Sequence, residues 1–276
     1  KTTVAGAFIK LAAAKAYADC DVDAPNLHLV RLQASLDRRS DYYGMGKAVI
    51  NQEFCTSCGS CGCHCRFNAI KEINGKYEVD VFACEGCGVC EAICPAGAVE
   101  LRPDVAGELR LYKNGDVFST AKLKMGSGTS GKLVTEVKKQ LIQETKDMHA
   151  DVAIIDGSPG IGCPVIASLS GVDMVLIVAE PSLSGISDME RIVKTARGFG
   201  LRIAVCVNKF DTNTRLTENI EAFCQENGLS FAGKIPFDSK AVRAVNKGQS
   251  IVDVDCPAGQ AVSAVFDNTM LILSNE

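Results

Sequence analysis

Two cysteine ladders between Cys55 and Pro95 constrain this chain more than any other feature. Each ladder has the pattern CxxCxxCxxxC, and proline follows the second one. Three thiolates at two-residue gaps can surround one face of an iron-sulfur cube, whereas the fourth points toward a second cube. The spacing therefore predicts two 4Fe-4S clusters with crossed ligation. One would be held by Cys55, Cys58, Cys61 and Cys94, and the other by Cys84, Cys87, Cys90 and Cys65.

Two features inside the ladders leave alternatives open. Sulfur donors also suit zinc, but zinc usually takes two separated CxxC pairs, so the spacing favours clusters. Cys63 lies between the ladder positions of the first repeat. It is expected to be a spectator, and the alternative is that it replaces a neighbouring ligand. His64 is expected to lie beside a cluster rather than to bind one.

The stretch from 52 to 103 resembles the two-cluster ferredoxin domain of bacteria, because all eight ladder cysteines fall in register. It departs from that pattern at Arg66, where free-standing ferredoxins usually have proline. The resemblance implies a small α+β domain that contains both clusters.

Composition limits the classes of protein to which the chain can belong. Its 276 residues and 47% hydrophobic content allow one large domain with a smaller insert. A net charge of -4 without a basic tract argues against nucleic acid as a partner. The apolar run from Met174 to Ala179 is too short to span a membrane, and no signal peptide opens the chain. With fourteen cysteines and no pairing pattern outside the ladders, we expect a reducing, cytoplasmic location.

The first residues, KTTVAGAFIKLAAA, are typical of a phosphate-binding loop that runs into a helix. Lys1 and Thr2 take the last two positions of the GK(S/T) motif, and Thr3 follows them. The chain begins without methionine, so we expect it either to start inside a longer gene product or to lack its first residues.

Two further stretches end a predicted strand on an aspartate. The segment AYADCD carries Asp19 and Asp21, and DVAIID closes on Asp156. A glycine-rich loop, GSPGIG, follows Asp156. A strand-terminal aspartate can hold the hydration shell of magnesium, and such a loop can move when the terminal phosphate is lost.

These motifs resemble the MinD, ParA and Mrp group of P-loop ATPases, which includes the nitrogenase iron protein. The resemblance implies that Lys1 and Thr3 help bind ATP or ADP, that Thr2 and Asp156 hold Mg²⁺, and that Asp21 orients the attacking water. The loops VNKFD and KIPFD follow later strands. By the same resemblance, Asn208 would contact adenine and Pro236 would pack against it.

Other signals lie between the motifs. Residues 104–125 alternate apolar and polar positions around Asn114-Gly115, which predicts a hairpin. GSGTSGK, at 126–132, matches the spacing of a phosphate loop, but Leu133 replaces the hydroxyl residue and no strand is predicted just before it. Ser130 is therefore interpreted as the N-cap of a helix with an apolar stripe from Leu133 to Ile142. The alternative is a role for this segment in nucleotide-dependent contacts.

The last part of the chain alternates strands and helices. MVLIVA and IAVCV are apolar runs of the kind that parallel sheets bury on both faces, and Ser187 with Glu190 predicts a helix start. Cys163 stands seven residues after Asp156, as does a cluster cysteine of the nitrogenase iron protein. It is expected to be a small buried residue, with a shared cluster as the alternative.

We therefore predict a doubly wound, mostly parallel α/β ATPase domain at 1–51 and 104–276, with a ferredoxin insert at 52–103. The expected function is an ATPase that couples nucleotide-dependent dimerisation to electron transfer. Its partners would be a second copy or a paralogue and an unidentified redox protein. An iron-sulfur assembly ATPase like Mrp and a positioning ATPase like MinD are the alternatives.

Overall fold

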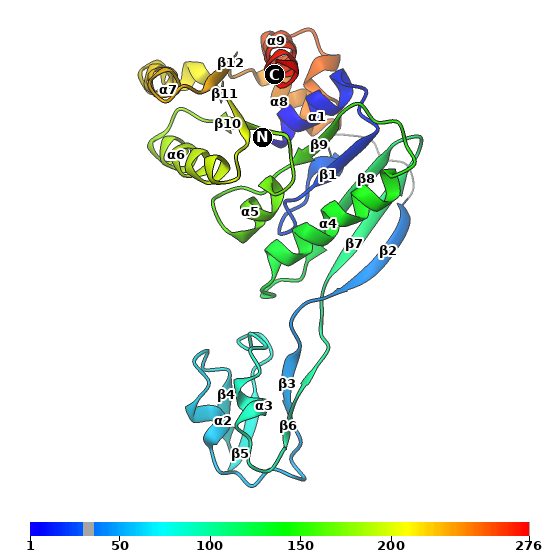
Figure 1. Ribbon diagram of the computed structural model, residues 1–276, viewed down its shortest axis with the longest axis vertical. Helices are drawn as coiled ribbons and strands as arrows, with labels where there is room; N and C mark the ends of the chain where they lie inside the picture. Colours follow the sequence, from blue (N-terminus) through cyan, green and yellow to red (C-terminus); the bar gives the residue numbers. More distant parts are fainter. Residues whose placement is uncertain (30–35, 276) are drawn as a thin grey trace.

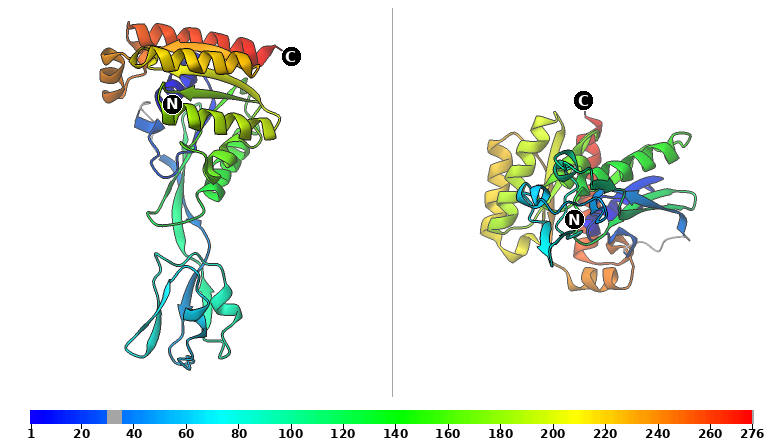
Figure 2. Two further views of the ribbon diagram at one scale, coloured as in Figure 1. Left: turned by 90° about the vertical axis from the view of Figure 1, so that its left-hand side faces the viewer. Right: turned by 90° about the horizontal axis from the view of Figure 1, so that it is seen from below.

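A computed structural model describes residues 1–29 and 36–275 of the chain. It shows a larger α/β body and a smaller unit at the end of a two-stranded connection (Figure 1). The smaller unit is formed by residues between 44 and 104, and it extends from one end of the body in the left view of Figure 2.

The body contains a five-stranded sheet in the order β2-β7-β8-β1-β9. Strand β1 pairs in parallel with β8 and β9, whereas β2, β7 and β8 form an antiparallel meander. The strands are β1 (Ala16–Asp19), β2 (Leu36–Tyr43), β7 (Val105–Lys113), β8 (Val117–Leu123) and β9 (Ala153–Asp156).

A second sheet of three parallel strands has the order β10-β11-β12. Its strands are β10 (Met174–Ala179), β11 (Arg202–Asn208) and β12 (Ser230–Ile235). Within the described residues, β9 pairs only with β1 and β10 only with β11, so each has one edge without a ladder partner. The strands of the body are thus mostly parallel, with an antiparallel edge formed by β2, β7 and β8. The hairpin predicted at 104–125 corresponds to β7 and β8 and does not include β2.

Helices cover both faces of the two sheets, as expected for a doubly wound fold. Helices α1 and α9 pack on one face, and α4, α5, α6 and α7 on the other. The body helices are α1 (Thr2–Leu11), α4 (Ser130–Thr145), α5 (Cys163–Leu169), α6 (Leu183–Gly198), α7 (Thr214–Glu226), α8 (Ser239–Asn246) and α9 (Pro257–Ser274), with short 3-10 turns η1 (Leu27–Leu29), η2 (Phe210–Thr212) and η3 (Ile251–Asp253).

Alternation along the strands explains this layering. In β1, Ala16 and Ala18 belong to the core under α4, whereas Tyr17 stacks on Phe118 in the core under α1. Successive side chains of a strand point to opposite faces, so an unbroken apolar strand can bury both.

The smaller unit is attached through two adjacent strands of the body. Strands β2 and β7 pair in antiparallel fashion, and after a short neck the same two chain segments pair again as β3 (Lys47–Ile50) and β6 (Val99–Arg102). The ends of the unit therefore leave and re-enter the body side by side (Figure 1). An insertion with neighbouring ends leaves the host sheet undisturbed.

Inside the smaller unit, one pattern occurs twice, with an offset of 29 positions. Strand β3, helix α2 (Ser60–Cys63) and strand β4 (Ile70–Ile73) correspond to β5 (Lys76–Val79), α3 (Val89–Ala92) and β6. The two short helices follow Gly59 and Gly88, both in the left-handed region near φ 79°. Each half contributes one strand to each hairpin, β3-β6 and β4-β5, so neither half is complete without the other.

Several local predictions need correction. Helix α4 begins at Ser130 with Thr129 as its N-cap, so Ser130 is the first helical residue. Strand β8 ends at Leu123, three positions before Gly126, so a strand does precede the glycine-rich segment. Ile142 is 67% exposed and lies off the buried stripe of α4. Helix α6 begins at Leu183 after Ser182, whose hydroxyl accepts the amide of Gly185, and not at Ser187.

In the part of the chain that the structure describes, no helix combines the length and apolar character needed to cross a membrane.

Helix α4 offers a test of the core. Leu133 is fully buried, and Leu133→Ala should lower the free energy of unfolding by about 2–5 kcal/mol because it leaves a cavity. Ile142→Ala on the same helix should change it by less than about 0.5 kcal/mol. Chemical denaturation of both variants measures the difference, and equal losses would contradict the assignment of the buried face.

Candidate functional site

The carboxyl ends of the parallel strands meet at one edge of the body. Asp19 and Asp156 are directly opposite each other in the β1-β9 ladder. Asn208 ends β11, and Glu180 follows β10. Crevices at this edge of open α/β sheets are the usual ligand sites.

Lys1 lies at this edge, at the N-terminus of helix α1. Its Nζ donates a hydrogen bond to Asp156 Oδ1 at 3.1 Å and another to the carbonyl of Gly157. The Lys1 side chain is 34% exposed, and that of Asp156 is fully buried. The ammonium group is therefore held between the end of β9 and the start of the glycine-rich loop, where it remains reachable from solvent.

Asp156 has one carboxylate oxygen without a partner. Oδ2 is buried and accepts no hydrogen bond within the described residues. A buried carboxylate oxygen normally has a donor or a cation. The site thus fits a hydrated Mg²⁺ at Oδ2. Thr2 is the first residue of α1 and follows Lys1 directly in the sequence. Carboxylates and waters are the ligands that Mg²⁺ prefers.

The two aspartates after β1 have different environments. Asp19 is fully buried and accepts the amides of Asp21, Asn26 and Leu27, so it shapes the loop that follows the strand. Burial raises the pKa of Asp19 to about 6, and the neighbouring Asp156 adds to the shift. Burial also raises the pKa of Asp21, while the charge of Lys1 opposes that rise. Asp21 is only partly buried, and its charge interacts with Lys1.

Asn208 and Pro236 are brought together at the ends of β11 and β12. Asn208 pairs with Ile235, the residue before Pro236. The amide of Phe237 donates to Asp211 Oδ1 at 2.8 Å, which joins the two loops. Lys209 bonds Glu180 at 2.7 Å and so connects this pair of loops to the end of β10. The sequence prediction did not include Glu180 or Asp211, although both follow a strand as the predicted site residues do.

The glycine-rich loop after Asp156 leads into helix α5. The hydroxyl of Ser158 donates to the carbonyl of Cys20, which ties the loop to the end of β1. Cys163 is the first residue of α5 and is exposed, so the expectation that it is buried is wrong. A Cβ atom on Gly131 would lie 2.9 Å from Cys163 Cβ, so the start of α4 approaches α5 closely.

The ladder cysteines surround two cavities in the smaller unit. Both cavities open to solvent, and the space in each, open solvent included, is similar, at about 340 and 320 Å³. The first is lined by Cys65, Cys84, Cys87 and Cys90, and the second by Cys55, Cys58, Cys61 and Cys94. These are the two crossed sets that the spacing predicts. Cys63 is exposed and lines neither cavity.

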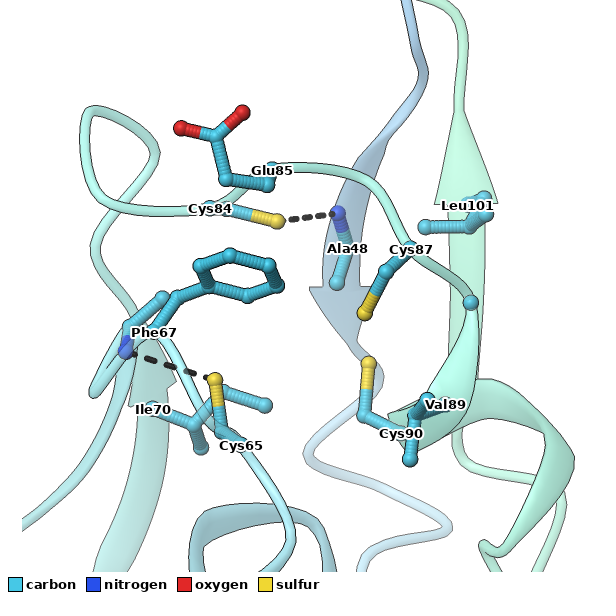
Figure 3. A pocket seen from close by; sticks show the side chains of 12 residues that line it. Ala48, Cys65, Phe67, Ile70, Cys84, Glu85, Cys87, Val89, Cys90 and Leu101 are labelled. Atoms are coloured by element: carbon cyan, nitrogen blue, oxygen red, sulfur yellow. Dashed lines mark hydrogen bonds between the residues drawn. The ribbon is translucent and has the colours of Figure 1, made fainter.

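Figure 3 shows how the first of these cavities is built. Cys65 enters from below, Cys84 from above, and Cys87 and Cys90 from the right of the view. Backbone amides donate to two of these sulfurs, from Ala69 to Cys65 at 3.4 Å and from Ala48 to Cys84 at 3.5 Å.

The second cavity repeats part of this arrangement. The amide of Ala98 donates to Cys94 Sγ at 3.3 Å, as that of Ala69 does to Cys65. Hydrogen bonds to Ser60 lower the pKa of Cys58. Such donors stabilise thiolates, and thiolates are the form that binds metal. Among the described residues, no three His, Cys, Asp or Glu side chains converge on the position of a single metal ion.

Comparison with known proteins gives a family match over most of the chain. The CobQ/CobB/MinD/ParA nucleotide binding domain matches residues 1–251. An uncharacterised protein of Methanocaldococcus jannaschii, MJ0578, is 33% identical over 71% of this chain and 67% of its own length. An iron-sulfur cluster carrier protein of Pyrococcus horikoshii is 32% identical over 48% of this chain and 49% of its own.

A solved structure shares the fold. The septum site-determining protein MinD of Pyrococcus horikoshii, complexed with Mg-ADP, aligns with a TM-score of 0.57. The alignment covers 97% of this chain and 89% of that one, at 14% identity.

Substitution of the two nearby cysteines Cys63 and Cys65 tests which of them is a cluster ligand. After anaerobic reconstitution, Cys65→Ser should lower bound iron from about eight to about four atoms per chain, because one set of four thiolates is broken. Cys63→Ser should keep the full content. Iron and acid-labile sulfide per chain are the measurements, and loss of iron from the Cys63 variant alone would reverse the assignment.

Proposed function

This chain belongs to the CobQ/CobB/MinD/ParA nucleotide-binding family, and from that starting point we propose that it is an ATPase that couples nucleotide-dependent dimerisation to electron transfer. The electrons would pass through two 4Fe-4S clusters in its insert. The grouping of the ladder cysteines into two cavities is the observation that supports the redox half of the proposal. The Lys1–Asp156 pair at the strand edge supports the nucleotide half.

The nucleotide half assigns a role to each residue at the edge of the sheet. The ammonium of Lys1 and the first amides of α1, near Thr2 and Thr3, would bind the phosphates of ATP. Thr2 and Asp156 would hold Mg²⁺, which supplies neutralisation of phosphate charge. Asp21 would orient the water that converts ATP to ADP and phosphate.

The loops after β11 and β12 complete the nucleotide half. Asn208 would contact adenine, and Pro236 would pack against the ring. The pairing of Asn208 with Ile235 supports this assignment, because it brings the two loops to one place.

The redox half rests on the smaller unit. We assign the ferredoxin insert to the smaller unit. The bounds expected from the sequence, 52–103 between body segments 1–51 and 104–276, are extended here to include β3 at 47–50, because β3 pairs with β6. The clusters would supply one-electron storage, at potentials set by hydrogen bonds and exposure. Eight thiolates of this chain would hold the clusters. Backbone amides of the repeated loops would donate hydrogen bonds to the sulfurs.

The redox proposal also implies partners. A nucleotide-dependent dimer with a second copy or a paralogue would face the strand edge, and a separate redox protein would donate or accept the electrons. Nothing in this arrangement requires nucleic acid.

A second function, transfer of clusters to other proteins, is favoured by the likeness to the Pyrococcus horikoshii carrier protein. Buried positions of Cys61, Cys84 and Cys90 argue for resident clusters instead. Outside the ladders, Cys163 is the exposed cysteine among those described, and the other four are buried.

Lys1 tests the nucleotide half. Lys1→Gln should lower the rate of ATP hydrolysis by roughly 100-fold, because a cation that offsets transition-state charge is lost. Lys15→Gln removes the same charge from an exposed position in the turn between α1 and β1 and should retain the rate. Phosphate release measured with both variants checks this, and equal rates would remove Lys1 from the site.

Electron transfer and cluster transfer differ in whether the iron stays bound to this chain or passes to another protein. In anaerobic, reduced protein, electron paramagnetic resonance should show that ATP changes the potential or the reoxidation rate of at least one cluster, with all iron retained. Transfer of intact clusters to an apo-ferredoxin, followed by its absorbance after separation, would instead establish the carrier function. Retained clusters without any effect of ATP would overturn the coupled proposal.

A further inference from the structure

The loop between Cys84 and Cys87 contacts the body of the protein directly. A Cβ atom on Gly128 would lie 2.9 Å from Glu85 Oε2, and one on Gly126 would lie 3.7 Å from the ring of Phe82. Gly128 and Gly126 belong to the segment that leads from β8 into α4. One wall of the first cavity thus lies against the segment that leads into helix α4.

The other end of that segment contacts the nucleotide side of the body. Gly131, in the first turn of α4, approaches Cys163 so closely that a Cβ atom would lie 3.1 Å from the Cys163 carbonyl oxygen. Cys163 follows directly after the glycine-rich loop 157–162. Six residues, 126–131, therefore span the distance between that loop and the cysteine loop.

Glu85 is the charged group at this contact. In Figure 3 its carboxylate points away from the cavity, while its backbone lies between two of the lining cysteines. The corresponding position of the first ladder, 29 residues earlier, is Thr56. Only the cavity that adjoins the body thus has a carboxylate at this position of its loop.

The start of α4 is suited to offset that charge. The helix has 16 residues, and no side chain caps its N-terminus. Such an end carries the equivalent of about half a positive charge, whose field falls off within the first turn. Lys47, whose Nζ donates to the Cys84 carbonyl, also faces this loop, but it belongs to β3 and moves with the smaller unit. The offset from α4 is the part that a shift of segment 126–131 can change.

We propose that segment 126–131 transmits the state of the glycine-rich loop to Glu85, and that the charge of Glu85 then sets the potential of the cluster held by Cys65, Cys84, Cys87 and Cys90. The inference rests on the proposed function. A carboxylate close to a cluster opposes the addition of an electron, so separation of α4 from Glu85 lowers the potential. Coupling of this kind is reciprocal, so reduction changes nucleotide affinity by the same factor as nucleotide changes the reduction equilibrium.

Two substitutions should move the potential in opposite directions. Glu85→Gln removes the charge and should raise the potential of one cluster while the other stays unchanged. Gly128→Ala pushes the carboxylate from the helix terminus and should lower the same potential; Gly128 does not have a left-handed φ, so alanine is compatible with its backbone. Glu78→Gln removes an exposed carboxylate from β5 of the same unit and is the matched control.

The experiment uses the full chain, reconstituted with iron and sulfide and titrated with dithionite under electron paramagnetic resonance. Titrations without nucleotide and with Mg²⁺ and a non-hydrolysable ATP analogue should differ in the wild type and in Glu78→Gln, and the difference should be lost in Glu85→Gln. Nucleotide dissociation constants of the oxidised and reduced wild type should differ tenfold for each shift of about 59 mV. Amide exchange across 124–131 should also change with the analogue in the wild type.

The outcomes separate the two proposals. If nucleotide does not change the cluster potentials of the wild-type protein, the proposed coupled function is wrong. A nucleotide-dependent shift that persists in Glu85→Gln, with full iron content, would leave the function standing and refute this route. Equal and same-sign effects of Glu85→Gln and Gly128→Ala would also refute it, because the model of an offset charge requires opposite signs.

Discussion

A buried carboxylate at the end of strand β9 is the constraint on which the rest of the nucleotide site depends. Removal of Asp156 from water costs several kcal/mol for an ionised group unless a partner restores the lost solvation. Lys1 restores part of it through Oδ1, and Oδ2 is left without a donor among the described residues. The helix that carries Lys1 must therefore begin at this strand end. Helix α1 then packs its apolar face on the sheet from that position, so the ion pair and the core determine one another.

The attachment of the smaller unit follows from strand pairing. Its two ends lie in β3 and β6, which pair as the continuation of β2 and β7. An insert of this kind interrupts the host only at the edge of its sheet, and the parallel strands that carry Asp19 and Asp156 are unaffected. The same geometry brings the loop of the first cavity against the body, at Glu85, although the two halves of the unit are repeats.

The sequence predicts the cysteine repeats and the strands that end on an aspartate. It does not predict contacts between loops that are distant in the chain. The cysteine spacing alone separates the two sets of four, because the fourth cysteine of each ladder is set apart from the first three and points toward the other cluster. The strand ends at Asp19 and Asp156 can be predicted equally well, because each follows an apolar run. The predictions that Ser130 caps the helix and that Ile142 belongs to its apolar stripe are wrong. A periodic apolar stripe shows that a helix is present but does not fix its first turn or the margins of its buried face. The exposure of Cys163 depends on how α5 begins after a glycine-rich loop, and no local pattern encodes that.

Whether a shift at the start of α4 can reach the smaller unit depends on the stiffness of the neck. Gly44 has no room for a side chain, since a Cβ atom would lie 2.8 Å from Ala106 Cβ, and one on Gly46 would lie 2.9 Å from the Arg102 carbonyl oxygen. Tyr42 adds a hydrogen bond to Thr129 Oγ1 at 3.2 Å, which joins the strand that enters the neck to the residue that caps α4. A neck packed this closely resists bending, because close-packed regions transmit displacement rather than absorb it. Movement of α4 relative to β2 would therefore strain the contact at Glu85 before it bent the neck, so the cysteine loop is the part of the smaller unit that responds first.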